Sequence, residues 1–302
     1  MSSNSGYATS QAGNKTCFFK CDYSFYHSHS CLKCKFCYRL IPSSPTPLKK
    51  LSGYLKGEAE HHESLYQVPV IVSRYCEPFL NETFTRHSMY VINNILTNGG
   101  KIIVRTSRSV LPDELYALIE TFHEKIMIQF RVAFHNSNSA KIIKKELCPG
   151  WSEWNDIANT LTKLECQKGI LFDPYIIGLN SQSDIANVVT DMAQIGVNKL
   201  IITQLFATPK FRSYLLNTNK EIGLKLQESV GNYFTYDNLH LLSSLLPTIE
   251  RCFKDNIKVS MCNNKHINQV LGLETNCCLF EKPEFMYEPT GNRINTKVIP
   301  GK

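Results

Sequence analysis

Three closely spaced cysteines, Cys31, Cys34 and Cys37, are the residues of this sequence whose spacing points most directly to chemistry. Three thiolates in one short loop can bind one face of a [4Fe–4S] cluster, each thiolate on a different iron. Three ligands leave the fourth iron open to chelate a substrate or cofactor, whereas a fourth cysteine would close the site. One of the two metal sites that this spacing allows is therefore an iron–sulfur centre that takes part in a reaction.

A structural zinc site is the alternative that local spacing leaves open. Tetrahedral zinc needs a fourth ligand, and four upstream side chains could supply it: Cys17, Cys21, His27 and His29. The chain has 12 cysteines among 302 residues and starts with a polar stretch instead of a signal peptide. Crowded cysteines in a reducing compartment indicate metal ligation rather than disulfides.

The composition predicts a soluble, cytoplasmic protein with a sizeable core. Hydrophobic residues make up 43% of the chain, and no apolar run is long enough to span a membrane. The net charge of +7 is spread along the sequence, which favours a solvated surface over a nucleic-acid footprint. Basic clusters at 49–50 and 141–145 keep nucleic-acid binding open.

Short β-branched runs alternate with helical patterns along most of the chain. We predict strands at 16–25, 68–73, 101–106, 125–134, 170–175, 199–205 and 257–261, and helices at 85–96, 112–124, 152–167, 184–195 and 236–254. Strands separated by such helices form parallel βαβ units, so the fold class is α/β.

These units predict a partial (β/α)6 TIM-type barrel over residues 15–261, with reactive groups at the C-terminal ends of the strands. An open, doubly wound sheet is the alternative. We expect residues 1–14 to be a disordered leader and residues 262–302 to be a cysteine-containing extension.

The segment Cys34-Lys35-Phe36-Cys37-Tyr38, following a first strand, resembles the cluster motif of the radical S-adenosylmethionine (SAM) superfamily. Four later segments are similar to its spore photoproduct lyase-like branch, in the same order along the chain: 73–86, 99–109, 130–134 and 173–179. The family spacing places Ser30 where the first ligand is expected. Cys31, one position later, is our choice, and Cys21 is the alternative.

This resemblance implies a radical SAM enzyme with a [4Fe–4S] cluster held by Cys31, Cys34 and Cys37. SAM would chelate the open iron and be cleaved reductively to start radical chemistry on a small molecule, a peptide or a nucleic acid. A protein such as flavodoxin or ferredoxin would supply the electron. Lyase, oxidoreductase and transferase outcomes all stay open. A zinc-stabilised α/β protein that binds nucleic acid without catalysis is the competing hypothesis.

The resemblance also assigns expected SAM contacts by position. Phe36 and Tyr38 would lie by the adenine, although both rings could instead pack the loop. Glu77 would accept from the SAM ammonium group, unless it is simply an exposed glutamate. Thr106 and Ser107 would bond to the ribose hydroxyls.

Arg131 needs a carboxylate partner because it lies within an apolar strand. That partner would be SAM, or else Glu77 or Asp173 in a structural pair.

Several polar residues near predicted strand ends could face the substrate. Asp173 and Gln204 are the candidate catalytic residues, and the pair His135-Asn136 is a further candidate. The late cysteines Cys262, Cys277 and Cys278, with Cys252 or Cys17, could hold an auxiliary cluster. One of them could instead donate a hydrogen atom, or all could be structural.

Overall fold

Seven strands form one sheet in which every neighbouring pair is parallel. The computed structural model describes residues 22–23, 34–36, 69–72, 77–135, 138–228, 233–262 and 264–273. Within them the sheet follows the order of the chain: β1 (Asp22–Tyr23), β2 (Val70–Val72), β3 (Ile102–Thr106), β4 (Ile126–Val132), β5 (Gln167–Tyr175), β6 (Lys199–Gln204) and β9 (Lys258–Cys262).

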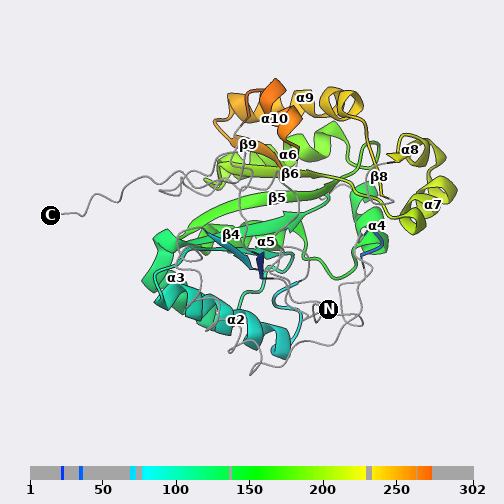
Figure 1. Ribbon diagram of the computed structural model, residues 1–302. Helices are drawn as coiled ribbons and strands as arrows, with labels where there is room; N and C mark the ends of the chain where they lie inside the picture. Colours follow the sequence, from blue (N-terminus) through cyan, green and yellow to red (C-terminus); the bar gives the residue numbers. More distant parts are fainter. Residues whose placement is uncertain are drawn as a thin grey trace, which may run out of the picture.

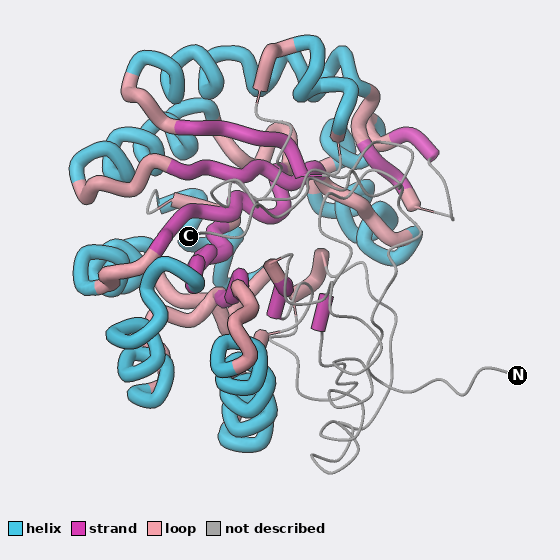
Figure 2. Tube along the Cα trace, turned by 60° about the vertical axis from the view of Figure 1, so that its left-hand side comes forward, coloured by secondary structure: helices cyan, strands magenta, loops and turns pink. Residues whose placement is uncertain are grey.

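Helices connect the strands and lie on the outside of the curved sheet (Figures 1 and 2). They are α2 (Glu82–Thr97), α3 (Asp113–Phe122), α4 (Asn138–Leu147), α5 (Trp154–Lys163), α6 (Gln182–Gln194), α7 (Pro209–Thr218), α8 (Lys220–Leu224), α9 (Asn238–Lys254) and α10 (Lys265–Val270), with a 3-10 turn at His123–Lys125. A two-stranded hairpin, β7 (Gln227–Glu228) and β8 (Phe234–Thr235), lies between α8 and α9. None of these described helices has the length and apolarity needed to cross a membrane.

The strand order confirms the predicted partial barrel. A doubly wound sheet reverses its strand order at a switch point, whereas here each strand pairs with the next one along the chain up to β6. After β6 the chain passes through α7, α8, the hairpin and α9 before β9 joins as the last strand. The C-terminal ends of all seven strands therefore lie along one edge.

The two faces of the sheet have different partners because side chains alternate along a strand. Val70, Val72, Val104 and Ile128 belong to the main hydrophobic cluster, together with buried side chains of the helices. Alternate positions are buried but lie outside that cluster: Ile71, Ile103, Met127, Leu171 and Ile201. The helices thus cover one face, and these five side chains mark the other, concave face.

Polar side chains continue this concave face toward the C-terminal ends of β3 and β4. Arg105 is 3% exposed, and its Nε donates a 2.8 Å hydrogen bond to Oε1 of Gln129 on the neighbouring strand. The amide of Gln129 in turn lies 3.4 Å from the Met127 sulfur. Arg131 follows on the same face of β4 and is also buried. The inside of the sheet therefore changes from apolar to polar as it approaches the edge where reactive groups are expected.

Several helical segments differ from the prediction. Helices α4, α7, α8 and α10 were not predicted, and α5 ends at Lys163, before β5 begins at Gln167. Gly169, two residues beyond the predicted helix 152–167, lies inside β5, opposite Gln129. A Cβ there would come within 3.1 Å of the Met127 side chain and 3.0 Å of the Lys199 carbonyl. Close packing against two neighbouring strands therefore accounts for this glycine.

The outer edge of β9 is covered by one side chain of α10. The Asn268 amide accepts a 2.8 Å hydrogen bond from the Met261 N–H and donates a 2.9 Å bond to the Met261 carbonyl. Asn268 is 4% exposed, and Met261 is fully buried. The amide therefore does for the edge strand what a further strand would do, by satisfying both main-chain groups.

We predict that Asn268→Ala lowers the free energy of unfolding by about 2 kcal/mol or more, because two buried main-chain groups lose their partners. Urea denaturation measures this difference. Gln269→Ala, one position along on the exposed side of α10, is the matched control and should change little. Equal midpoints for the two variants would show that the sheet edge does not depend on Asn268.

Candidate active site

Glu77 is a buried carboxylate that joins the start of α2 to the end of β3. It is 2% exposed. Its Oε1 accepts a 2.7 Å hydrogen bond from the Thr106 hydroxyl and a 3.2 Å bond from the Phe79 N–H. Its Oε2 accepts a 2.7 Å bond from the Ser107 N–H. The structure thus brings three sequence-predicted residues, Glu77, Thr106 and Ser107, into one group, which we call the Glu77 shelf.

Burial is the main influence on the charge of Glu77 and raises its pKa above the usual value. The hydrogen bonds from Ser107, Thr106 and Phe79 and the positive charge of Arg131 act in the opposite direction but do not cancel it. Since the ionised form is penalised by lost hydration, a cation that bound beside Glu77 would lower that penalty. The alternative of a simply exposed glutamate is therefore wrong. Arg131 lies close enough for its positive charge to favour the ionised carboxylate.

The two hydroxyls of the shelf differ in what they can still bind. Thr106 donates to Glu77, and its oxygen also accepts a 3.0 Å bond from the Arg108 N–H. The Ser107 hydroxyl is buried and has no hydrogen-bond partner among the described residues. Buried hydroxyls are normally paired. Of these two hydroxyls, the one on Ser107 is therefore available to bind a ligand.

The connection between α4 and α5 is fastened to the end of β3 beside this shelf. The Ser152 N–H donates a 2.9 Å bond to the Ser107 carbonyl, and the Ser152 hydroxyl accepts a 2.8 Å bond from the Ser109 N–H. Lys144, nearly buried, donates to the Ser152 carbonyl and forms a 3.2 Å ion pair with Glu153. Main-chain and charged contacts thus hold Ser152 in place from both sides.

The end of α4, just before this connection, contacts the described part of the cysteine loop, residues 34–36. The Lys35 N–H donates a 2.7 Å bond to the Leu147 carbonyl, and its ammonium group forms a 2.7 Å ion pair with Glu146. Glu146 also accepts from the Tyr214 hydroxyl on α7. These contacts raise the pKa of Lys35, chiefly through the hydrogen bond to Glu146, and lower the pKa of Glu146 for the same reason. The cysteine loop is therefore tied by its backbone and by charge to α4.

Cys34 and Phe36, the residues just before and just after Lys35, both contact Trp151. The Trp151 indole N–H donates to the Cys34 sulfur at 3.1 Å. Phe36 is 8% exposed and meets Trp151 edge to face, with ring centroids 5.7 Å apart, and it also lies 6.4 Å from Phe211 of α7. The Phe36 ring thus packs the loop against the α4–α5 connection and α7.

Trp151 and Cys148 were missed from the sequence. Both lie in the turn after α4, where the main-chain N–H of Trp151 donates to the Cys148 carbonyl at 3.2 Å. Burial, and secondarily the nearby Cys34, raise the pKa of the Cys148 thiol well above its usual value, so it stays neutral. The sequence Cys-Pro-Gly-Trp at 148–151 does indicate a turn. Because α4 was not predicted, however, nothing in the sequence placed this turn beside residue 34.

The remaining predicted residues lie in other surroundings. His135 shares the Asp191 carboxylate with Trp154, through contacts of 3.1 Å and 2.6 Å respectively, so it links β4 to α5 and α6. Gln204, at the end of β6, accepts a 3.4 Å bond from Asn264. Asp173 is half-buried on β5 and precedes the cis peptide bond to Pro174.

Cys262 is buried at the end of β9, and Cys252 is buried in α9. Several predicted residues lie outside the described residues: the leader 1–14, Cys17, Cys21, His27, His29, Cys31, Cys37, Tyr38, Asn136, Cys277 and Cys278. In the part of the chain that the structure describes, no three His, Cys, Asp or Glu side chains are grouped to hold a metal.

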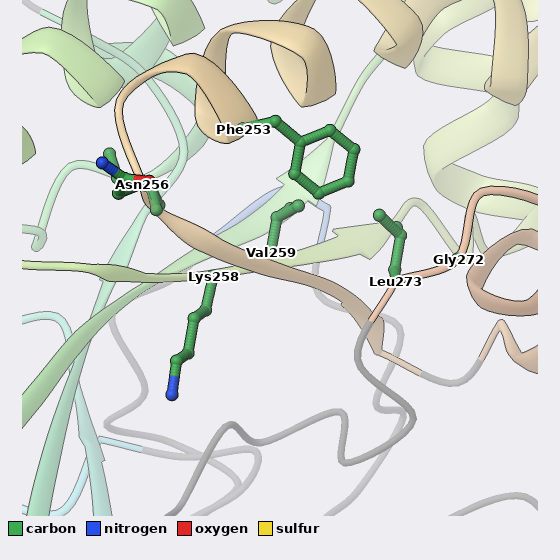
Figure 3. Close-up of a pocket in the computed structure, with 7 residues that line it drawn as sticks. Phe253, Asn256, Lys258, Val259, Gly272 and Leu273 are labelled. Atoms are coloured by element: carbon green, nitrogen blue, oxygen red, sulfur yellow. The ribbon is translucent and has the colours of Figure 1, made fainter.

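A pocket lies away from the shelf, beside the first residues of β9 (Figure 3). Phe253, Val259 and Leu273 gather on one side of the strand, while Lys258 points to the other. No sequence-predicted site residue lines this pocket. The chemistry is therefore to be sought at the C-terminal strand ends rather than here.

Comparison with known proteins identifies the fold. No protein-family model and no curated protein sequence matches this chain. A cysteine-to-serine mutant of spore photoproduct lyase aligns with a TM-score of 0.55 at 12% identity, covering 77% of this chain and 73% of that one. A second mutant of that enzyme, with bound AdoMet and dinucleoside spore photoproduct, gives 0.51 at 12%, covering 76% and 72%.

Streptococcus suis SuiB bound to its precursor peptide SuiA gives a TM-score of 0.55 at 12% identity, covering 87% of this chain. This chain spans about half of SuiB, 53% of its length. Spore photoproduct lyase and SuiB are both radical SAM enzymes. The curved parallel sheet, with the Glu77 shelf at its C-terminal edge, therefore shares its fold with spore photoproduct lyase and SuiB.

Proposed function

We propose that this chain is a radical SAM enzyme whose cluster is held by Cys31, Cys34 and Cys37. The observation that carries the proposal is a single connection between the two halves of the site. Trp151 contacts the Cys34 sulfur, and the adjacent Ser152 holds the end of β3 at the Glu77 shelf. A cysteine loop and an anionic shelf are thereby tied together at the strand ends of a radical SAM fold.

The described residues fit a [4Fe–4S] cluster at Cys34. Its sulfur accepts a hydrogen bond from an indole N–H, and sulfur is a good acceptor when it carries the charge of a metal-bound thiolate. When bound, the cluster supplies the electron that cleaves SAM to methionine and a 5′-deoxyadenosyl radical. The part of the protein described here holds one edge of the loop, through the Lys35 contacts to Leu147 and Glu146.

The shelf fits the methionyl end of SAM, which carries one ammonium and one carboxylate group. Glu77 would accept from the ammonium group, which would compensate the burial that raises its pKa. Arg131 would face the carboxylate, because its positive charge already acts on the same site. The free Ser107 hydroxyl would bond to SAM, whereas Thr106 positions Glu77. Phe36 and Tyr38 remain the proposed residues near the adenine.

The substrate belongs to one of three classes: a small molecule, a peptide or a nucleic acid. SuiB bound to a precursor peptide supports a peptide, and spore photoproduct lyase bound to a dinucleoside photoproduct supports a nucleic acid. Asp173 and Gln204, on β5 and at the end of β6, are the proposed residues that face it. A flavodoxin- or ferredoxin-type protein is the proposed reductant.

Glu77→Gln should weaken SAM binding about tenfold or more, because a hydrogen bond to a charged group contributes about 1.5–3 kcal/mol. Equilibrium dialysis of the reconstituted protein with labelled SAM measures the dissociation constant. Glutamine keeps the size of the side chain and removes the charge that burial penalises, so the variant should remain folded. Glu120→Gln, on the exposed side of α3, is the control and should bind SAM normally. Unchanged binding in Glu77→Gln would remove Glu77 from the site.

Cys34→Ala should abolish assembly of the cluster and SAM cleavage. The full chain, reconstituted anaerobically with iron and sulfide, should be brown and release 5′-deoxyadenosine from SAM under reduction. Iron analysis and product chromatography measure both properties. Cys166→Ala removes a half-buried thiol in the segment before β5 and should leave both unchanged.

A colourless wild-type protein with stoichiometric zinc would overturn the proposed function in favour of the zinc-stabilised alternative. Methylthioadenosine as the product would show that a different S–C bond is cleaved. Separate Cys31→Ala and Cys21→Ala variants, compared by iron content, identify the first ligand.

A further inference from the structure

We infer that Trp151 sets the reduction potential of the cluster through its N–H···S hydrogen bond to Cys34. This inference rests on the proposed function, because it requires Cys34 to be a cluster ligand. It adds a positioning residue that neither the sequence motif nor the Glu77 shelf contains. Trp151 would act through Cys34, without contacting SAM or the substrate.

The contact is direct and short. The Trp151 Nε1 lies 3.1 Å from the Cys34 sulfur, compared with 3.4 Å between the Gln129 amide and the Met127 sulfur on the sheet. Indole N–H is a donor only, so sulfur is the accepting group. Both side chains are half-buried, where reduced hydration strengthens such a bond.

The geometry of the donor is fixed by its neighbours. The edge-to-face contact with Phe36, at an interplanar angle of 88°, restrains the indole ring. The bond from the main-chain N–H of Trp151 to the Cys148 carbonyl restrains the backbone of Trp151. The acceptor is restrained as well, since the next residue, Lys35, is bonded to Leu147 and Glu146. The hydrogen bond therefore joins two groups that are each held independently of it.

The electrostatic consequence has a definite sign. Adding an electron increases the negative charge on the cluster and on its thiolate sulfurs. A hydrogen-bond donor to such a sulfur stabilises the reduced form more than the oxidised form, so the reduction potential is higher with the bond than without it. Trp151 would therefore make the cluster easier to reduce by a weak protein reductant.

The two tryptophans of the chain offer a matched pair of variants. Trp151→Phe removes the N–H at Cys34 and keeps an aromatic ring for Phe36 to pack against. Trp154, three residues further along the chain, supplies the control: Trp154→Phe removes an indole N–H that donates to Asp191. The full-length, reconstituted proteins are titrated anaerobically, and the midpoint potential is followed by electron paramagnetic resonance, together with iron content and the Fe–S stretching bands in resonance Raman spectra.

We expect a more negative midpoint potential and altered Fe–S stretching frequencies in Trp151→Phe, with full iron content. Trp154→Phe should match the wild type. An unchanged potential in a fully loaded Trp151→Phe protein would overturn the inference while leaving the proposed function intact. A wild-type protein that assembles no cluster would instead defeat the proposed function itself.

A second measurement applies if Trp151→Phe loses its iron. In a Trp154→Phe background, Trp151 is the only tryptophan, and it can be replaced during expression by benzothienylalanine, which keeps the bicyclic shape but has sulfur in place of N–H. A loaded protein with a lowered potential would support the inference. Loss of iron in this isostere too would overturn it, by showing that Trp151 is needed for assembly rather than for tuning.

Discussion

The candidate site depends on the short connection between α4 and α5. Trp151 donates to the Cys34 sulfur, and the next residue, Ser152, donates its main-chain N–H to the Ser107 carbonyl. Adjacent residues therefore fix the cysteine loop and the end of β3 relative to each other. The ion pair of Lys144 with Glu153 and the Lys144 bond to the Ser152 carbonyl stiffen this link. This link holds two groups that are far apart in sequence, the cysteine loop and the Glu77 shelf, at the same end of the sheet.

Glu77 shows why the shelf is suited to a charged ligand. Three donors hold the carboxylate in one orientation, yet burial still raises its pKa. The donors alone do not replace the lost hydration, so part of the electrostatic cost of burial is left for a cation to relieve. A group that is oriented in advance and incompletely compensated binds its partner with little reorganisation. This arrangement supports the proposed contact between Glu77 and the ammonium group of SAM.

Much of the fold was predictable because buried parallel strands read as short β-branched runs, such as Val70–Val72 and Ile102–Thr106. Glu77, Thr106 and Ser107 were singled out through the family resemblance, which places them near the ends of such strands, and the structure brings them together at one edge. Helix α4 was missed because its lysine-rich sequence resembles a basic surface cluster, and most of its residues do face solvent. Trp151 was missed for a different reason. Its partner Cys34 is 117 residues away, and only the tertiary fold brings the indole and the thiol together.

The two faces of the sheet have different roles: one packs in the hydrophobic core, and the other carries buried polar side chains toward the candidate site. Helices bury the face with Val70, Val104 and Ile128, and Asn268 closes the β9 edge, so the hydrophobic core does not require the concave face to be apolar throughout. That face can hold Arg105 and Arg131, which are costly to bury. The polar layer begins where β3 and β4 approach the Glu77 shelf. The sheet thus supplies a positive environment beside the shelf, while the α4–α5 connection sets the position of the cysteine loop.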